Sequence, residues 1–426
     1  MCDILNVGGE PIFDDRIVKI ETHTYNPYVN TTFEHSDEIR IPIQQQDLYT
    51  LPCQRFLYVE EKMTVTTKDE EEVFLANNCV AFMFDEICYK FNGMEIDRNR
   101  NVGITTTIKN YVSLTHDKSM AMKNAGWDIT QHTDVDSYFS FCVPLSMILG
   151  FCEDYKRTII NARHELILIR SRNDKNCITA VSEVGGEALD GKIELFKIQW
   201  RMPHVVLNNV TKLSLLRTLE NGRYLTISFR SWDLYEFPLL QSTTKHSWAV
   251  KTATQLEKPR YVIFALQTAR RNHMSADVTR FDHCQLTNVK LYLNSEFYPY
   301  DDLHLDFDKN KYAVLYHTYT HFRKAYYGCG VVVPFLTISN FLQCGPLVVI
   351  DCSRQNEAVK SATVDVRLVV IDCSRQNEAV KSATVDVRIE FDCKENIPAN
   401  TTAYCLILHD RVIEYNSLTN VVRKIT

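Results

Sequence analysis

Two strand-like runs around a polar loop, in residues 257–300, constrain the fold of this chain more than any other feature. Pro259 fixes its own φ at roughly −65° and pushes the residue before it into extended geometry. The run Tyr261–Leu266 is aromatic and β-branched, and it is too short for an ordinary helix. After the loop, apolar residues recur at every second position from Val289 to Leu293, as in a strand with one buried face. The stretch therefore predicts two core strands of an all-β domain.

Length and composition fit a large globular protein. The chain has 426 residues, of which 45% are hydrophobic and 23% charged, which favours two or three domains. Glycine and proline are sparse, which argues against long disordered linkers. The 21 Phe and 21 Tyr are a high aromatic load, and in a β-rich chain they indicate sandwiches with aromatic-filled interiors.

Charge and cysteine usage exclude several classes of protein. A formal net charge of −6 argues against coating nucleic acid, and we expect no direct sequence-specific binding to it. The start of the chain lacks the pattern of a signal peptide, and no apolar run reaches the ~20 residues of a membrane span. We therefore expect an intracellular protein whose 14 cysteines are reduced core thiols. Because none of them is spaced as CxxC, we also expect no structural zinc knuckle. The sequons at Asn30, Asn209 and Asn400 then carry no glycosylation.

Two similar series of strands follow each other along the chain. Those of the first half are expected at Ile17–Tyr25, Phe56–Val65, Cys79–Phe91, Met94–Asp97, Tyr138–Val143, His164–Arg170 and Ile193–Met202. Those of the second half are expected at Tyr224–Trp232, Leu234–Leu240, Ser247–Thr254, Tyr261–Leu266, Leu286–Asn294, Leu347–Cys352, Val385–Cys393 and Ala403–Tyr415. Asn92-Gly93 is a strong hairpin signal, because both residue types tolerate positive φ.

Helices are expected at a few places between these strands. Apolar residues at helical spacing indicate helices at Asn101–Leu114 and Tyr312–Tyr326, and a short one from Pro144 to Tyr155. A connector helix at Asn209–Leu219 is capped by Asn209 and ends at Asn221-Gly222.

The strand count predicts an all-β fold of two tandem eight-stranded jelly-roll sandwiches, with short helices inserted in loops. We expect an N-terminal arm over residues 1–35 and a first jelly roll over 36–204. A connector helix over 205–222 then leads to a second jelly roll over 223–426.

The second roll contains a literal tandem repeat. Residues 347–367 read LVVIDCSRQNEAVKSATVDVR, and residues 368–388 read the same without a change. Structural repeats diverge in sequence, so an identical copy indicates a recent duplication or an assembly error rather than a functional array. One sandwich has room for one such unit, and we expect the other copy to be displaced, paired at an edge or poorly ordered.

The sequence carries no recognisable catalytic motif. Phosphate-binding loops, dinucleotide-binding turns, metalloprotease helices and nucleophile elbows are absent, as is the HxH pair of a metal-binding cupin. His317 and His321 lie four residues apart on an expected helix, which is workable zinc spacing. Two imidazoles on the outer face of an aromatic-rich helix are the more ordinary interpretation. We therefore expect no enzyme activity, no catalytic, cofactor-binding or metal residues, and no cofactor.

Other polar groups are better explained by structure than by chemistry. The pairs His164-Glu165 and Asp282-His283 place an acid beside a histidine, but neighbours in a strand point to opposite faces. They are therefore not expected to act as catalytic dyads.

Two charged groups remain to be weighed. Asp97, Arg98 and Arg100 have the composition of an anion site, and a helix-capping salt bridge is the simpler interpretation. The run Asp69–Glu72 is interpreted as a solvated loop.

Several segments together resemble a known family. They are SDEIRIPIQQQDLYTLP at 36–52, FLYVEEKM at 56–63, EIDRNRNVGITTTIKNY at 95–111, FCVPLSMILGFCEDYKRTIINARHELILIR at 141–170, KIQWRMPHV at 197–205, EKPRYVIFALQT at 257–268 and FDHCQLTNVKLYLNSEFYPY at 281–300. In this order they resemble the double jelly-roll major capsid proteins of the Polinton/Maverick or adintovirus-like lineage, which is related to adenovirus hexon. The likeness covers roughly residues 36–416, and the identical repeat and the short chain depart from it.

This resemblance implies a structural role in a virion. Such chains form homotrimers, which give pseudo-hexameric capsomers that tile an icosahedral shell. Expected partners are further copies of the same chain, in the trimer and in neighbouring capsomers, and a penton-type protein with a single jelly roll. Assembly would take place in the cytoplasm or nucleus of a host cell. No functional residue carries over, because the family has no catalytic motif.

Two alternatives remain open. A glycan-binding or carbohydrate-active β-sandwich protein would need a suitable cleft, and a hydrolase would need paired carboxylates in it. A host-domesticated capsid relative would keep the fold without assembling, and the tandem repeat fits such a copy of the gene.

Overall fold

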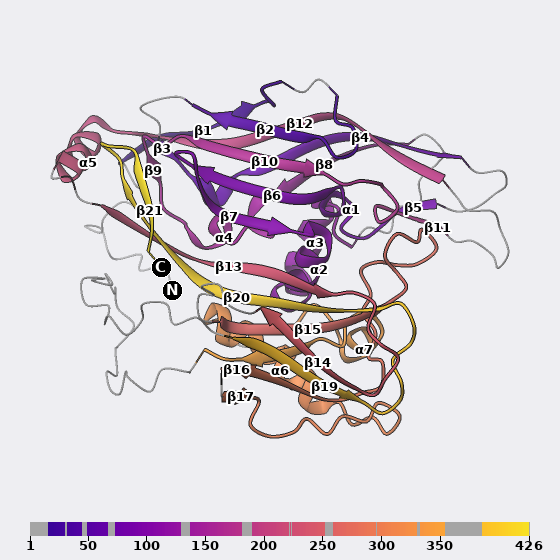
Figure 1. Cartoon of the computed structure of the whole chain (residues 1–426). Coiled ribbons are helices and arrows are strands. Elements are labelled where there is room, and N and C mark those ends of the chain that lie inside the picture. The colour runs from indigo at the N-terminus through magenta and orange to yellow at the C-terminus, as the bar shows by residue number, and fades with distance from the viewer. Residues whose placement is uncertain are drawn as a thin grey trace, which may run out of the picture.

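The computed structural model describes most of the chain, in two β-sandwiches that lie side by side (Figure 1). The described residues are 16–29, 32–44, 49–66, 73–128, 137–180, 190–220, 222, 224–251, 259–294, 296–329, 333–353 and 386–425. The strands of the two sandwiches run in roughly the same direction, as Figure 1 shows.

The first jelly roll is built from two sheets. The strands of one sheet, in spatial order, are β1 (Ile17–Tyr25), β12 (Asp190–Leu207), β4 (Phe56–Thr66) and β8 (Ser137–Pro144), with short β3 (Tyr49–Thr50) and β9 (Ile159–Ile160) added beside β12. The strands of the other are β2 (Glu38–Ile43), β10 (His164–Arg170), β6 (Phe84–Phe91) and β7 (Met94–Arg100). A separate short pair joins β5 (Val73–Leu75) to β11 (Ile178–Ala180).

The second jelly roll repeats this plan. The strands of its first sheet are β13 (Leu225–Phe237), β20 (Thr401–Asn416), β15 (Pro259–Thr268) and β18 (Val348–Asp351), with β21 (Val421–Ile425) added to β20. The strands of its second sheet are β14 (Lys245–Lys251), β19 (Val387–Cys393), β16 (Leu286–Leu293) and β17 (Glu296–Tyr298).

The strand order is therefore the same in both rolls. β1, β12, β4 and β8 correspond to β13, β20, β15 and β18, and β2, β10, β6 and β7 correspond to β14, β19, β16 and β17. This correspondence confirms the expectation of two tandem jelly-roll sandwiches.

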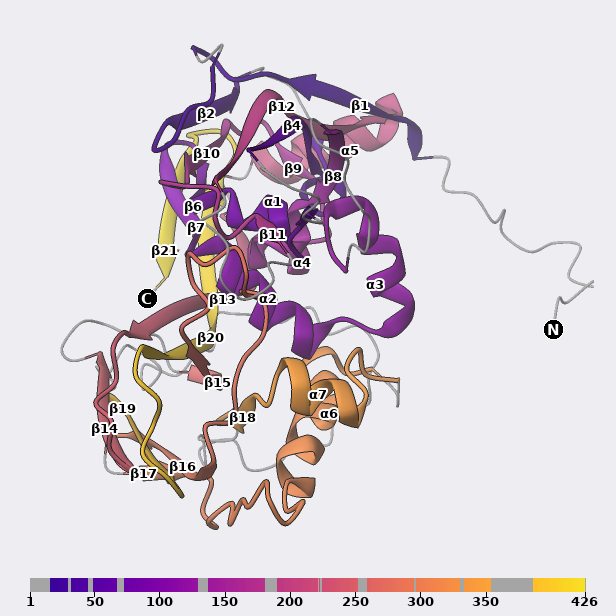
Figure 2. The same ribbon diagram turned by 90° about the vertical axis from the view of Figure 1, so that its right-hand side faces the viewer.

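Helices are inserted at matching places in the two rolls. α2 (Val102–Ser113) and α3 (His116–Met122) lie between β7 and β8, and α6 (Ala313–Tyr327) and α7 (Ile338–Cys344) lie between β17 and β18. Figure 2 shows these four helices along one side of the molecule. The remaining α-helices of the described chain are α1 (Cys79–Phe82), α4 (Gly150–Asp154) and the connector α5 (Asn209–Glu220). Short 3₁₀ turns cover Pro52–Gln54, Lys123–Ala125 and Leu145–Met147.

Local sequence explains many of these elements. Asn92 and Gly93 both have positive φ, at 49° and 81°, so they form the hairpin between β6 and β7 as expected. β10 lies between β2 and β6, and its Leu166 and Leu168 are fully buried, so it is a central strand of its sheet. The two strands around the loop of residues 257–300 are β15 and β16, whose inward residues belong to the hydrophobic core.

Four local expectations were wrong. The connector helix is capped by Asn208 rather than Asn209, because Oδ1 of Asn208 accepts a hydrogen bond from the backbone N–H of Thr211 at 2.7 Å. Cys79–Phe82 is helical rather than extended, because Asn78 turns the chain with φ of 60° and the segment packs on α2 beside Gly103. Residues 224–240 hold one continuous strand, since β13 pairs with β20 without a break from Leu225 to Phe237. The short helix after Pro144 is divided into a 3₁₀ turn and α4, with Leu149 extended between them.

Two further short helices, α3 and α7, carry no helical stripe long enough to be noticed in the sequence. Each begins at a threonine whose hydroxyl accepts a hydrogen bond from the backbone N–H three residues on, at Thr115 and Thr337. The cap residue is therefore the signal that could have found them.

Strand pairing does not test most of the expected domain limits. The pairing of β1 concerns the limit expected at residue 36, between the N-terminal arm and the first roll. β1 lies ahead of residue 36 and pairs with the end of β12, from Ile17 opposite Leu207 to Tyr25 opposite Trp200. We propose that the first roll begins at β1.

The tandem repeat lies in the connection between β18 and β19. The first copy supplies β18, and the end of the second copy supplies the start of β19 at Val387 and Arg388. Residues 354–385 lie outside the described residues, and so does the expectation that one copy is displaced. The acidic run Asp69–Glu72 also lies outside them.

One buried cluster of charge lies inside the first roll. Arg170 and Asp174 form an ion pair, each with a side chain only 1% exposed, and the Arg170 guanidinium also donates to the backbone oxygen of Met83. Glu61 on β4 is equally buried, and among the described residues neither of its carboxylate oxygens has a hydrogen-bond partner. Burial, reinforced by Asp174 and opposed by Arg170, raises the pKa of Glu61 to about 8.

Candidate functional site: the contact between the two rolls

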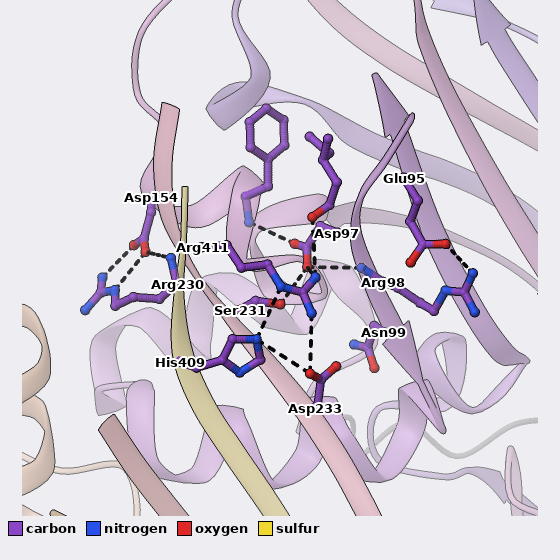
Figure 3. A network of polar contacts seen from close by, with 12 residues as sticks. Glu95, Asp97, Arg98, Asn99, Asp154, Arg230, Ser231, Asp233, His409 and Arg411 are labelled. Atoms are coloured by element: carbon purple, nitrogen blue, oxygen red, sulfur yellow. Dashed lines mark hydrogen bonds and ion pairs between the residues drawn. The ribbon is translucent and has the colours of Figure 1, made fainter. Parts of the chain in front are cut away.

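The surface on which the two rolls meet is the candidate functional site. From the first roll it takes β7, α2 and α4, and from the second it takes β13, α6 and, through Arg411, β20. We call this surface the roll–roll contact. Figure 3 shows its central polar residues.

The backbones approach most closely where α4 meets β13. A Cβ atom on Gly150 would lie 1.8 Å from the backbone oxygen of Arg230, so only glycine fits at this position. The next residue, Phe151, packs edge-to-face against Phe229 with 5.3 Å between ring centroids. Glycine and phenylalanine thus set the distance between the two rolls here.

Asp97 on β7 is the most buried acid of the contact, with 2% exposure. Its carboxylate accepts hydrogen bonds from the backbone N–H of Phe151 at 2.9 Å and from the hydroxyl of Ser231 at 2.9 Å (Figure 3). Arg411 on β20 lies 3.9 Å away as an ion-pair partner. Burial raises the pKa of Asp97, and Arg411 and these hydrogen bonds oppose the rise. One side chain therefore ties β7 to α4 and to the second roll.

Arg411 extends this network within the second roll. Its guanidinium contacts Asp233 at 3.4 Å, donates to Nε2 of His409 at 3.2 Å, and reaches the backbone oxygen of Ile96 at 3.4 Å. The arginine thus joins two strands of the second roll to β7 of the first.

A second polar node links α4 to β13 and α6. The Arg230 guanidinium donates two hydrogen bonds to the Asp154 carboxylate, from Nε to Oδ2 at 2.7 Å and from Nη2 to Oδ1 at 2.5 Å. Its backbone N–H donates to the same carboxylate at 2.8 Å, and its Cζ lies 3.7 Å from the ring centroid of Tyr326. Burial alone would lower the pKa of Arg230. The hydrogen bonds to Asp154 outweigh this effect, and the pKa of Arg230 is raised above its usual value. The arginine is therefore held as a cation between the rolls.

Two more ties connect the helices. Lys109 on α2 is 4% exposed and pairs with Glu153 at 2.9 Å, and the Tyr327 hydroxyl donates to the same glutamate at 2.8 Å. The Tyr319 hydroxyl on α6 donates to the backbone oxygen of Tyr111 on α2 at 3.0 Å. The contact between α2 and α6 is thus fixed by hydrogen bonds as well as by packing.

Both ends of the contact are closed by further hydrogen bonds. At the end beside α5, the Tyr415 hydroxyl donates to the backbone oxygen of Ile160 at 2.9 Å, and Asn92 donates to the backbone oxygen of Asn420 at 3.0 Å. At the other end, the amides of Asn176 and Asn272 are joined at 3.2 Å. The two rolls are therefore held together along their whole shared length.

A polar cleft opens between the rolls at this second end. Its volume is about 520 Å³, and its lining includes Arg172, Asn173, Arg271 and Asn272. Asp85 is the one acid among the lining residues. The cleft has hydrogen-bonding groups for a polar ligand, but it lacks the pair of carboxylates that glycoside hydrolysis requires.

His317 and His321 lie on α6 with ring centroids 3.9 Å apart, and Nδ1 of His321 lies 3.0 Å from the backbone oxygen of His317. Among the residues that the structure describes, no group of three or more potential metal ligands occurs. Both histidines are exposed, and the expectation that they bind no metal stays a prediction.

The two acid–histidine pairs are separated by their surroundings. His164 is buried, lies 3.0 Å from the Thr50 hydroxyl, and has its pKa lowered well below the usual value by burial, whereas Glu165 pairs outward with Arg40 at 3.4 Å. They point to opposite faces of β10, as the strand geometry predicts.

The second pair lies in the loop ahead of β16. Asp282 binds Arg270 at 2.7 Å, whereas His283 stacks on Phe307 with 4.4 Å between ring centroids. Neither acid orients its neighbouring histidine.

The expectation for Asp97, Arg98 and Arg100 was partly wrong. Arg98 and Arg100 pair with the strand acids Glu86 and Glu95, so neither caps a helix. Asp97 belongs to the roll–roll contact. Sequence reasoning did not find Arg230, Asp154 or Arg411, because their partners are far away along the chain.

Comparisons with known proteins agree with this architecture. A family model described as a double jelly roll-like domain matches residues 73–369 and 367–413. A comparison with curated protein sequences found no match. Among the part of the chain that is described, no helix is long and apolar enough to cross a membrane.

Solved structures of viral proteins have a similar fold. A chain of the Sputnik virophage is 9% identical with a TM-score of 0.62, and the alignment covers 99% of this chain and 91% of that one. The Faustovirus major capsid protein is 9% identical with a TM-score of 0.60, covering 96% and 92%. The mavirus major capsid protein is 10% identical with a TM-score of 0.55, covering 99% and 93%. At these identities the likeness establishes the fold.

Proposed function

Because the chain belongs to the family of double jelly roll-like domain proteins, we propose that it is a major capsid protein and acts as a structural subunit of a virion. The observation that carries this proposal is the roll–roll contact, in which two rolls of the same strand order are locked side by side by buried ion pairs. A rigid pair of matching rolls suits a shell, because each chain can then offer two equivalent building units of fixed geometry. The capsid proteins of Faustovirus and mavirus have this fold.

In this proposal three copies form a ring of six rolls, and such rings tile an icosahedral shell as pseudo-hexameric capsomers. Head-to-tail contacts between identical chains give a closed ring when the rotation from one chain to the next closes. A penton-type protein with a single jelly roll would fill the fivefold positions. The Polinton/Maverick or adintovirus-like origin is part of the proposal and rests on the sequence resemblance.

The full chain can be tested by size-exclusion chromatography with light scattering. We expect a trimer of about 148 kDa, three times the chain mass of 49.4 kDa. A stable monomer at micromolar concentration would contradict the proposal. Negative-stain images then separate an assembling protein, which forms shells alone or with its penton partner, from a host-domesticated relative, which forms trimers without shells or no oligomer.

The polar cleft at one end of the roll–roll contact favours a second candidate function, the binding of a glycan. Its volume of about 520 Å³ suits a small saccharide, and its asparagine amides and arginines can bind hydroxyl and carboxylate groups. Saturation-transfer NMR with neutral and acidic oligosaccharides tests this function. Equal signal from wild type and from an Asn272→Ala variant would count against a site in the cleft.

A further inference from the structure

Two exposed apolar strands lie at opposite ends of the molecule. On β1, Ile17, Val18 and Ile20 are 38%, 62% and 50% exposed. Phe297 on β17 and Tyr300 just after it are 42% and 83% exposed, and their rings stack with 6.0 Å between centroids. Figures 1 and 2 agree in placing β1 at one end of the pair of rolls and β17 at the other. Exposed apolar groups on edge strands mark surfaces that a partner covers.

The fold itself indicates what these strands would contact. Within the chain, β7 of the first roll lies against β13 of the second. By strand order, β1 is the counterpart of β13, and β17 is the counterpart of β7. Each roll therefore has a β13-like edge and a β7-like edge, and one edge of each kind has no neighbouring roll within the chain.

The corresponding strands differ in burial. Apolar residues on β13 and β7 are covered at the roll–roll contact, whereas apolar residues on β1 and β17 are exposed. On β13, Ile227 and Phe229 are 1% and 3% exposed, because the first roll and the core of the second cover them. On β7, Ile96 is fully buried, whereas Phe297 on β17 is 42% exposed. The two open edges thus carry apolar residues where the two closed edges bury theirs.

The open edges also have opposite charge. Arg16 and Lys19 give the start of β1 two positive charges against one negative charge at Glu21. The segment 296–302 after β16 has three acidic residues and no basic residue, and Lys290 on β16 offsets one of the three by pairing with Asp302 at 3.0 Å, which leaves a net negative charge. Complementary charge favours contact between the two different edges over contact between two copies of the same edge.

We propose that β1 of one copy docks against β17 and Tyr300 of a second copy, in a head-to-tail contact that repeats the roll–roll contact between chains. This inference rests on the proposed function and names the surface through which the trimer forms. A contact between two different surfaces leaves one of each kind open at every step, so it closes only as a ring. The internal repetition of the rolls makes six equivalent positions, which three chains fill.

The test uses two variants that each damage one edge. Val18→Asp and Phe297→Asp place a carboxylate in the proposed contact at exposed positions, so each chain can fold. Leu239→Asp is the matched control, because Leu239 is 70% exposed and lies on neither edge. We expect wild type and control to run as trimers of about 148 kDa. Each edge variant alone should run as a 49.4 kDa monomer, with association weakened about 100-fold.

Mixing the two edge variants gives the decisive result. The Val18→Asp chain keeps an intact β17 edge, and the Phe297→Asp chain keeps an intact β1 edge, so an equimolar mixture should form one heterodimer of about 99 kDa and no trimer. Formation of this dimer also proves that both variants are folded. Trimers in both variants, loss of the trimer in only one of them, or a mixture that stays monomeric would overturn this interface. A monomeric wild type would instead overturn the proposed function and this inference together.

Discussion

The ion pair between Asp154 and Arg230 should couple the stability of the two rolls. Their side chains are only 14% and 18% exposed, and the arginine makes two charge-assisted hydrogen bonds to the carboxylate and stacks on Tyr326. Removing one partner of a buried pair costs about 3–5 kcal/mol, because the other charge stays buried without its partner. We expect Arg230→Ala to lower the free energy of unfolding by about 3–4 kcal/mol.

A double-mutant cycle isolates the pair from the other losses. Asp154→Ala, Arg230→Ala and the double variant are unfolded in urea, and the transition is followed by tryptophan fluorescence. This signal reports both rolls, because Trp127 and Trp200 lie in the first and Trp232 and Trp248 in the second. The coupling energy should be about 2–3 kcal/mol, since the cost of the stranded charge disappears in the double variant.

The matched control is Lys192–Glu194, an exposed pair at 3.2 Å within one strand of the first roll. Its cycle should give about 0–1 kcal/mol. A coupling below about 0.5 kcal/mol for Asp154–Arg230 would refute the view that this node fixes the rolls to each other.

Three other variants test separate parts of the structure. Gly150→Ala should destabilise the protein by about 1–3 kcal/mol in the same urea assay, because its Cβ would overlap the backbone oxygen of Arg230; a neutral result would contradict the close approach of α4 to β13. The pKa of Glu61 is raised to about 8 by burial, so its contribution to stability is present below the unfolded pKa of about 4.5 and is lost as pH rises through 8. Glu61→Gln should remove this loss of stability, which is measured as the melting temperature between pH 5 and 9. If the melting temperatures of variant and wild type change with pH in the same way, Glu61 is not a neutral carboxyl. Deleting residues 354–374 removes one copy of the repeat and leaves 14 of the 35 residues between β18 and β19. Because a shorter connection costs less entropy to close, we expect the free energy of unfolding to be unchanged or raised by about 0.8 kcal/mol at most, and the melting temperature to stay the same or rise slightly. A large loss of stability would show that the second copy is part of the fold.

Much of the fold follows from local sequence, because strands and helices are encoded by residues that are neighbours along the chain. Alternating Leu and Ile marked β10, the pair Asn92-Gly93 marked the hairpin, and the aromatic stripe of 312–326 marked α6. Local patterns failed where a segment is buried on all sides. Cys79–Phe82 is apolar throughout, and a short apolar run has no periodicity that separates strand from helix.

The candidate site was beyond the reach of local pattern. Arg230 and Asp154 are 76 residues apart, and Arg411 lies more than 300 residues from Ile96, whose backbone it contacts. The sequence around an arginine does not show whether its side chain faces water or a buried carboxylate. Only the packing of one roll on the other decides which of these it does.

The sequence by itself determined that this chain folds into two similar series of strands, since alternation and turn residues act over a few residues. The tertiary structure decided which edges of the two rolls are closed and which stay open. β13 and β1 hold the same place in their rolls, yet one is buried against a neighbouring roll and the other is exposed. This difference arises because burial depends on the neighbour in space, and a single chain supplies a neighbour to only one of the two.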